Sequence, residues 1–155
     1  MYNIETKINR LLGFELNYED HLIIWEFVVL WNYFERNVCE KDFKPDKVEE
    51  YVKQINQKSI DGYYNYFRTR YVCNTSTNSH FEELFPTTRG RKEEVKNLLL
   101  GKEEASLDKT SAIILIVYRL RCNLFHGIKT ADMLKRQEVL FRQACMFLLD
   151  ILGSN

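Results

Sequence analysis

The most constraining feature of this sequence is a continuous apolar run, 112–117, that extends at helical spacing to Phe125. A segment that is apolar on all sides is typical of a helix at the centre of a bundle. Its β-branched residues would also suit a strand, but the length of the pattern favours a helix. We expect Ser106 or Asp108 to begin this helix and Gly127 to end it in a left-handed conformation.

Helical patterns also flank this run on both sides. Only two prolines and six glycines interrupt the 155 residues, which favours helices over strands. The region 42–105 is richer in polar loops, above all at 73–79 and 87–91. We therefore predict an all-α fold, a four- to five-helix bundle with a loop-rich insert, in which residues 1–155 form a single domain. The predicted helices cover about 4–12, 17–38, 45–55, 61–71, 93–100, 106–126 and 130–151.

Composition restricts the classes of function. The 22 basic and 22 acidic residues balance, which argues against nonspecific coating of nucleic acid but leaves room for a local basic site. The four cysteines have no metal-ligand spacing, and His21 and His80 have no suitable partners, so we predict no metal site and no cofactor. The apolar runs are shorter than the ~20 residues of a membrane span, and the N-terminus lacks a signal-peptide pattern. We expect a cytoplasmic protein.

The end of the apolar helix changes character abruptly, because Arg119, Arg121, Asn123 and His126 follow the apolar run. Charged groups are rarely buried without partners, so function is expected where such groups end a buried helix. Arg121 and His126 project about 140° apart at ~3.6 residues per turn, whereas Cys122 and His126 share one stripe. A ligand that touches both Arg121 and His126 has to lie across the helix end, or a second copy has to supply one group.

This segment resembles a known family motif. The run Arg121-Cys-Asn-Leu-Phe-His126, followed by Gly127, resembles the R-x4-6-H motif of HEPN domains, and it lies near the end of a penultimate, very apolar helix. The aromatic-rich stretch 22–35 is similar to the first long HEPN helix, in which a Phe-Glu pair follows such a stretch. Two positions depart from the pattern. Cys122 follows the arginine, where many members have a polar residue, and Ile128 stands where some toxin members carry a tyrosine that a partner modifies.

The resemblance implies a metal-independent endoribonuclease that acts as a homodimer with a composite site. Arg121 would hold the scissile phosphate of RNA, and His126 would transfer a proton during attack by the 2′-hydroxyl, giving a 2′,3′-cyclic phosphate. Asn123 and Glu35 would support the site, with capping, an interface role or simple solvation as alternatives. The resemblance also implies a toxin or defence effector with an antitoxin or nucleotidyltransferase partner. The alternative is a non-catalytic HEPN-like module that binds a nucleotide or a partner protein.

Several other cations are weaker candidates for RNA contact. An aromatic cluster at 63–71 contains two arginines and would either stack on single-stranded RNA or form a tyrosine-rich rim of the core, which is the favoured interpretation. For Arg121 and His126 themselves, the alternative to catalysis is that they stabilise the C-terminus of the helix, where cations are favoured. A short basic stretch, Arg89, Arg91 and Lys92, is interpreted as a solvated loop. The weaker RNA-binding candidates are Arg68, Arg70, Arg119 and Lys129.

Overall fold

The computed structural model describes residues 3–13, 15, 17–55, 59–125 and 137–153, and the fold is almost entirely helical. This confirms the predicted all-α class. A two-stranded antiparallel hairpin lies in the stretch that was predicted to be a loop, because Val72 pairs with Thr77 and Cys73 with Ser76. The elements are α1 (Ile4–Leu12), α2 (Tyr18–Asn37), η1 (Pro45–Lys47), α3 (Val48–Val52), α4 (Asp61–Tyr71), β1 (Val72–Cys73), β2 (Ser76–Thr77), α5 (Ser79–Leu84), α6 (Lys92–Leu99), α7 (Lys109–Phe125) and α9 (Glu138–Leu152).

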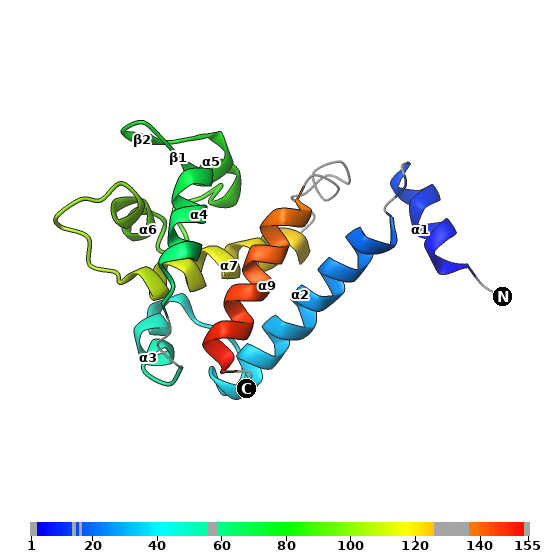
Figure 1. Ribbon diagram of the computed structural model, residues 1–155, viewed down its shortest axis with the longest axis horizontal. Coiled ribbons are helices and arrows are strands. Elements are labelled where there is room, and N and C mark those ends of the chain that lie inside the picture. Colours follow the sequence, from blue (N-terminus) through cyan, green and yellow to red (C-terminus); the bar gives the residue numbers. More distant parts are fainter. Residues whose placement is uncertain (1–2, 14, 16, 56–58, 126–136, 154–155) are drawn as a thin grey trace.

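Helix α7 forms the centre of the molecule. Residues 112–117 are all helical and at most 1% exposed, which excludes a strand there. Asp108 begins the helix as predicted, because its carboxylate accepts hydrogen bonds from the Ser111 amide and hydroxyl at 2.8 and 2.9 Å. Helices α2 and α9 pack side by side, and α3, α4, α5 and α6 each contact α7 (Figure 1). The predicted C-cap Gly127 lies outside the described residues.

Helix α2 packs against α9 through one face only. Asn17 caps it in a reciprocal capping box with Asp20, as its sequence indicates. Phe27 is fully buried and meets the ring of Phe141 at 5.0 Å, edge to face. The apolar pattern of this helix suggested burial on two sides, and that expectation is wrong. The opposite face leaves Trp25 62% exposed.

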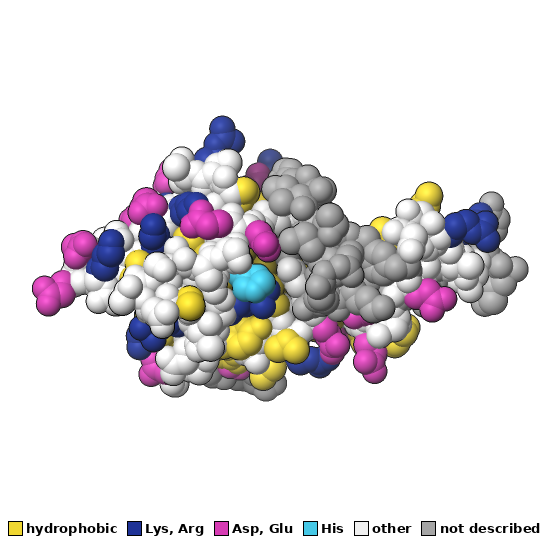
Figure 2. Space-filling view, turned by 90° about the horizontal axis from the view of Figure 1, so that it is seen from above, with side chains coloured by type: hydrophobic (Ala, Val, Ile, Leu, Met, Phe, Trp, Pro, Cys, Tyr) yellow, Lys and Arg dark blue, Asp and Glu magenta, His cyan; other side chains and the backbone are white. Residues whose placement is uncertain are grey.

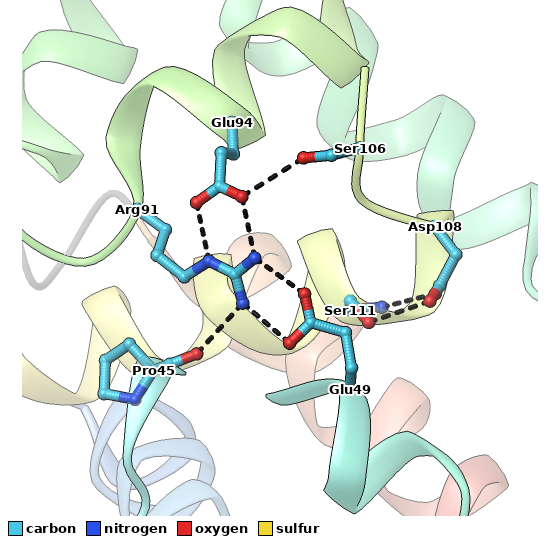
Figure 3. Close-up of polar contacts among 7 residues, drawn as sticks. All are labelled: Pro45, Glu49, Arg91, Glu94, Ser106, Asp108 and Ser111. Carbon is cyan, nitrogen blue, oxygen red and sulfur yellow. Dashed lines mark hydrogen bonds and ion pairs between the residues drawn. The ribbon is translucent and has the colours of Figure 1, made fainter. Parts of the chain in front are cut away.

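The middle region contains short helices between its loops, and an arginine ties them together. Arg91 was expected in a solvated loop, but its side chain is only 17% exposed. Its guanidinium contacts both carboxylate oxygens of Glu49 at 2.6 and 2.8 Å, both oxygens of Glu94 at 2.6 and 2.7 Å, and the Pro45 carbonyl at 3.2 Å (Figure 3). Hydrogen bonds to Arg91 lower the pKa of both glutamates. This network joins η1 and α3 to α6.

Helix α1 stands away from the rest of the molecule (Figure 1). It begins at Asn3, whose side chain caps the helix, and it ends at Gly13, which adopts φ +75° as its position in the sequence predicts. Most of its apolar residues are exposed, with Ile4 65% and Leu11 88% exposed. In the part of the chain that is described, no helix combines the length and the apolar character that crossing a membrane requires.

Candidate functional site at the end of helix α7

Two polar residues of the motif region fasten α7 to the end of α5. The Asn123 amide nitrogen donates to the carbonyls of Glu83 and Leu84, both at 3.2 Å. Arg119 donates to the Leu84 carbonyl and to the Asn123 side-chain oxygen, also at 3.2 Å each. Asn123 is 2% exposed. These contacts satisfy carbonyls that the last turn of a helix leaves without partners. Among the roles expected for Asn123, the structure therefore shows a capping role, at the C-terminal end of α5. The Arg119 guanidinium is likewise occupied by hydrogen bonds to protein atoms.

Arg121 lies on a different side of α7. Its guanidinium carbon is 5.3 Å from the centroid of the Phe125 ring, one turn further along the helix. The Arg121 side chain is half-buried, and Phe125 is 57% exposed, so this pair lies at the surface. Among the described residues, no carboxylate lies within ion-pair distance of Arg121. Arg121 therefore differs from Arg119, whose guanidinium donates to the Leu84 carbonyl and to the Asn123 side chain.

The stripe that contains Tyr118 and Cys122 faces inward. The Tyr118 ring lies 4.8 Å from Phe43 and 6.0 Å from Trp31. Burial, followed by a hydrogen bond with Cys122, raises the pKa of Tyr118 to about 12. Cys122 is 6% exposed, as expected for a thiol at a helix interface. His126 and Lys129 lie outside the described residues, so their predicted roles stay predictions.

Glu35 holds a loop in place. One oxygen of its carboxylate accepts a hydrogen bond from the Phe43 backbone amide at 2.8 Å. This contact ties the end of α2 to the segment that follows it. The structure therefore gives Glu35 a local structural contact, and among the described residues no hydrogen bond joins Glu35 to Arg121 of the candidate site.

The aromatic cluster of α4 forms part of the core, as the favoured interpretation of its sequence predicted. Phe67 and Tyr71 are at most 1% exposed. Arg68 donates from Nε to the Leu99 carbonyl at 3.0 Å, and the Tyr64 hydroxyl donates to the Leu98 carbonyl at the same distance. Arg68 therefore caps the C-terminal end of α6. Arg70 is different, because its side chain lines a cavity.

This cavity has a volume of about 270 Å³ and lies between α4, α5, α7 and the start of α9. The Arg70 Nε atom is buried and has no hydrogen-bond partner. Figure 2 shows one face of the molecule, on which basic, acidic, histidine and hydrophobic side chains lie next to one another. Sequence reasoning missed this cavity because four separate segments contribute to it. Its lining comprises Arg70, Tyr71, His80, Glu83, Leu84, Pro86, Leu120, Asn123, Gln137 and Leu140.

Comparison of the chain with protein-family models, with characterised proteins and with solved structures gave no match. Within the described residues, no three side chains of the kinds that bind metals gather in one place. The chemistry of the candidate site is therefore argued from Arg121, its surroundings and the cavity on the neighbouring side of α7.

Proposed function

We propose that this protein is an endoribonuclease of HEPN type that cleaves RNA without a metal ion, through attack by the 2′-hydroxyl. The observation that carries the proposal is the state of Arg121. Its neighbours Arg119 and Asn123 are held by hydrogen bonds to protein atoms. Among the described residues, Arg121 instead lies beside the Phe125 ring and near Tyr118, with no carboxylate at ion-pair distance. A guanidinium in this state can bind two phosphate oxygens at once.

The proposed reaction needs one proton acceptor, one proton donor and a cation. The 2′-hydroxyl loses its proton and its oxygen attacks the phosphorus. The bond from phosphorus to the 5′-oxygen then breaks, and that oxygen takes up a proton, leaving a 5′-hydroxyl and a 2′,3′-cyclic phosphate. His126 is assigned the transfer of a proton during attack by the 2′-hydroxyl, since imidazole has a pKa near ~6.5. Arg121 is assigned the stabilisation of charge on the phosphate.

A second copy of the chain is proposed to complete the site, and an exposed apolar face supports this part of the proposal. The outward side of α2 carries apolar residues at intervals of four, three, four and four positions, close to the spacing of a helix–helix seam. The outward side of α9 adds three more apolar residues. The exposed residues are Tyr18, Leu22, Trp25, Val29 and Tyr33 on α2 and Val139, Met146 and Leu149 on α9. We call them the α2–α9 face.

The size of the α2–α9 face suits a dimer of identical chains. Its three aromatic residues are between 54% and 71% exposed, so each would bury roughly that fraction of the ~150–250 Å² of a whole aromatic side chain if fully covered. With the five aliphatic residues, the exposed apolar area is on the order of the ~800 Å² that each partner contributes to a standard interface. A two-fold axis would let the same face serve both chains. Trp and Tyr are also enriched in such interfaces.

The proposal is tested by incubating the purified protein with a defined RNA in the presence of EDTA. We expect cleavage by the wild type and none by His126→Ala or Arg121→Lys, because an ammonium group cannot make the two-pronged phosphate contact. Arg10→Lys is the matched control, since Arg10 is an exposed arginine on α1, which stands away from the rest of the molecule, and it should cleave like the wild type.

Two results would reject the assignment of an enzyme. Equal cleavage by all variants would show a contaminating nuclease. Binding of RNA without cleavage by the wild type would instead favour the non-catalytic HEPN-like module. A role as a toxin or defence effector, held in check by an antitoxin or a nucleotidyltransferase, belongs to the same proposal and depends on cleavage being found.

A further inference from the structure

We infer that the cavity between α4, α5, α7 and α9 binds a guanine base that is turned out of single-stranded RNA. This inference rests on the proposed function and adds a substrate preference to it. A cavity of about 270 Å³ with a mostly apolar lining and a few polar groups has the character of a pocket for one small ring system.

The walls of the cavity suit a flat, apolar-faced ring. Leu84 and Leu140 are 4% and 2% exposed, so they belong to the core. Pro86 and Leu120 complete the apolar lining from the segment after α5 and from α7. Bases that leave the stack of a single strand are usually held between apolar or aromatic side chains. The cavity can therefore hold a base by its faces.

The polar groups of the cavity determine which hydrogen-bonding groups a ligand must present. Arg70 lines the cavity with a cationic guanidinium whose carbon lies 5.7 Å from the centroid of the Tyr71 ring, and its buried Nε makes no hydrogen bond, which is costly for a donor. Glu83 lines the same cavity from α5, and its side chain is about half exposed, so its carboxylate can accept hydrogen bonds. His80 Nδ1 lies 3.9 Å from that carboxylate. A cationic donor and a carboxylate acceptor thus share one cavity.

Guanine matches this pair better than the other bases do. Its O6 and N7 atoms accept hydrogen bonds from an arginine, which is the commonest specific contact between arginine and a base. Its N1–H and N2–H₂ groups lie side by side and suit the two oxygens of one carboxylate. Adenine, cytosine and uracil each lack two adjacent donors of this kind. The combination of Arg70 and Glu83 therefore selects guanine.

The cavity is also close enough to Arg121 to act on the same strand. Leu120 and Asn123 line the cavity and flank Arg121 in the same two turns of α7. A helix with its side chains is ~10–12 Å across, a distance that one or two extended nucleotides can span. A guanine in the cavity would therefore be near the phosphate that Arg121 is proposed to hold.

Direct binding tests the cavity without any need for cleavage. Titration of the protein with guanosine, adenosine, cytidine and uridine, followed by NMR chemical shifts, should show guanosine binding at least ~10-fold more tightly, since a good two-pronged contact contributes about 1–3 kcal/mol. Arg70→Met and Glu83→Gln should lose this preference. Arg89→Met and Glu93→Gln are matched controls on exposed positions outside the cavity and should keep it.

Mapping of cleavage sites then separates the two proposals. On an RNA that contains all dinucleotides, the wild type should cut mainly beside guanosines, and Arg70→Met should cut with little preference while its circular dichroism stays unchanged. Cleavage without base preference, together with equal or absent binding of all four nucleosides, would overturn the guanine site but leave the ribonuclease. Selective guanosine binding without any cleavage would reject the ribonuclease and keep the site.

Discussion

Replacement of Asn123 by alanine should destabilise the fold, because this residue of the motif region serves structure. The Asn123 side chain makes three hydrogen bonds, two to carbonyls at the end of α5 and one from Arg119. At about 0.5–1.5 kcal/mol each, and with buried partners left unpaired, the expected loss is about 2–4 kcal/mol of the free energy of unfolding. For a chain of this length that corresponds to a fall in Tm of roughly 5–15 °C.

The matched variant is Arg121→Ala, two positions away on the same helix. Arg121 is half-buried and, among the described residues, makes no hydrogen bond or ion pair, so its removal should change the free energy of unfolding by less than about 0.5 kcal/mol. Urea titrations and thermal melts followed by circular dichroism measure both variants. If Asn123→Ala unfolded within about 0.5 kcal/mol of the wild type, or if Arg121→Ala were the more damaging change, the assignment of structural and functional roles at the end of α7 would be wrong.

Three further perturbations test other parts of the structure. Arg91→Met should lower the free energy of unfolding by about 1–3 kcal/mol at neutral pH. Because Arg91 lowers the pKa of two glutamates, this difference should be present above the usual glutamate pKa of about 4.5 and vanish as the pH falls below it. A difference that grew in acid would contradict this prediction. Trp25→Asp should convert a dimer to a monomer in sedimentation, whereas Leu11→Asp on α1 should not; the reverse result would exclude the α2–α9 face. Among the four cysteines, the exposed Cys73 should be alkylated fastest and the buried Cys122 slowly, without selective loss of activity; rapid alkylation of Cys122 that abolished activity would make it a candidate nucleophile.

The elements that local sequence determines were predicted correctly. The apolar run of α7, the Asp108 cap, the capping box at Asn17 and the left-handed Gly13 all depend on residues close together in the chain. Periodicity and capping chemistry describe such features directly. The all-α class followed from them.

Features that depend on distant contacts were missed. The sequence alone predicts that Arg91 lies in a solvated basic loop. Only the fold brings Glu49 to within hydrogen-bond distance of Arg91. The apolar pattern of α2 shows which residues avoid water, but it does not say whether the same chain covers them, so Trp25 was wrongly expected to be buried. The cavity beside Arg70 needs four elements to form and leaves no local pattern in the sequence.

At the candidate site, the sequence drew attention to the correct helix end but did not separate its polar residues by role. Arg119 and Asn123 look like Arg121 in composition and spacing. The structure distinguishes them, because α5 presents carbonyls to one side of α7 and not to the other. Helical geometry gives the direction of each side chain, whereas the partner on each side is a property of the whole fold.

The chemistry of the cut ends tests the central claim most directly. A short RNA is incubated with the protein in EDTA, and the masses of the products are measured. The account predicts fragments that end in a 2′,3′-cyclic phosphate paired with fragments that begin with a 5′-hydroxyl, and the loss of both in His126→Ala while dimer and fold persist. Products that carry a 5′-phosphate, or cyclic-phosphate products that His126→Ala forms at the wild-type rate, would contradict it.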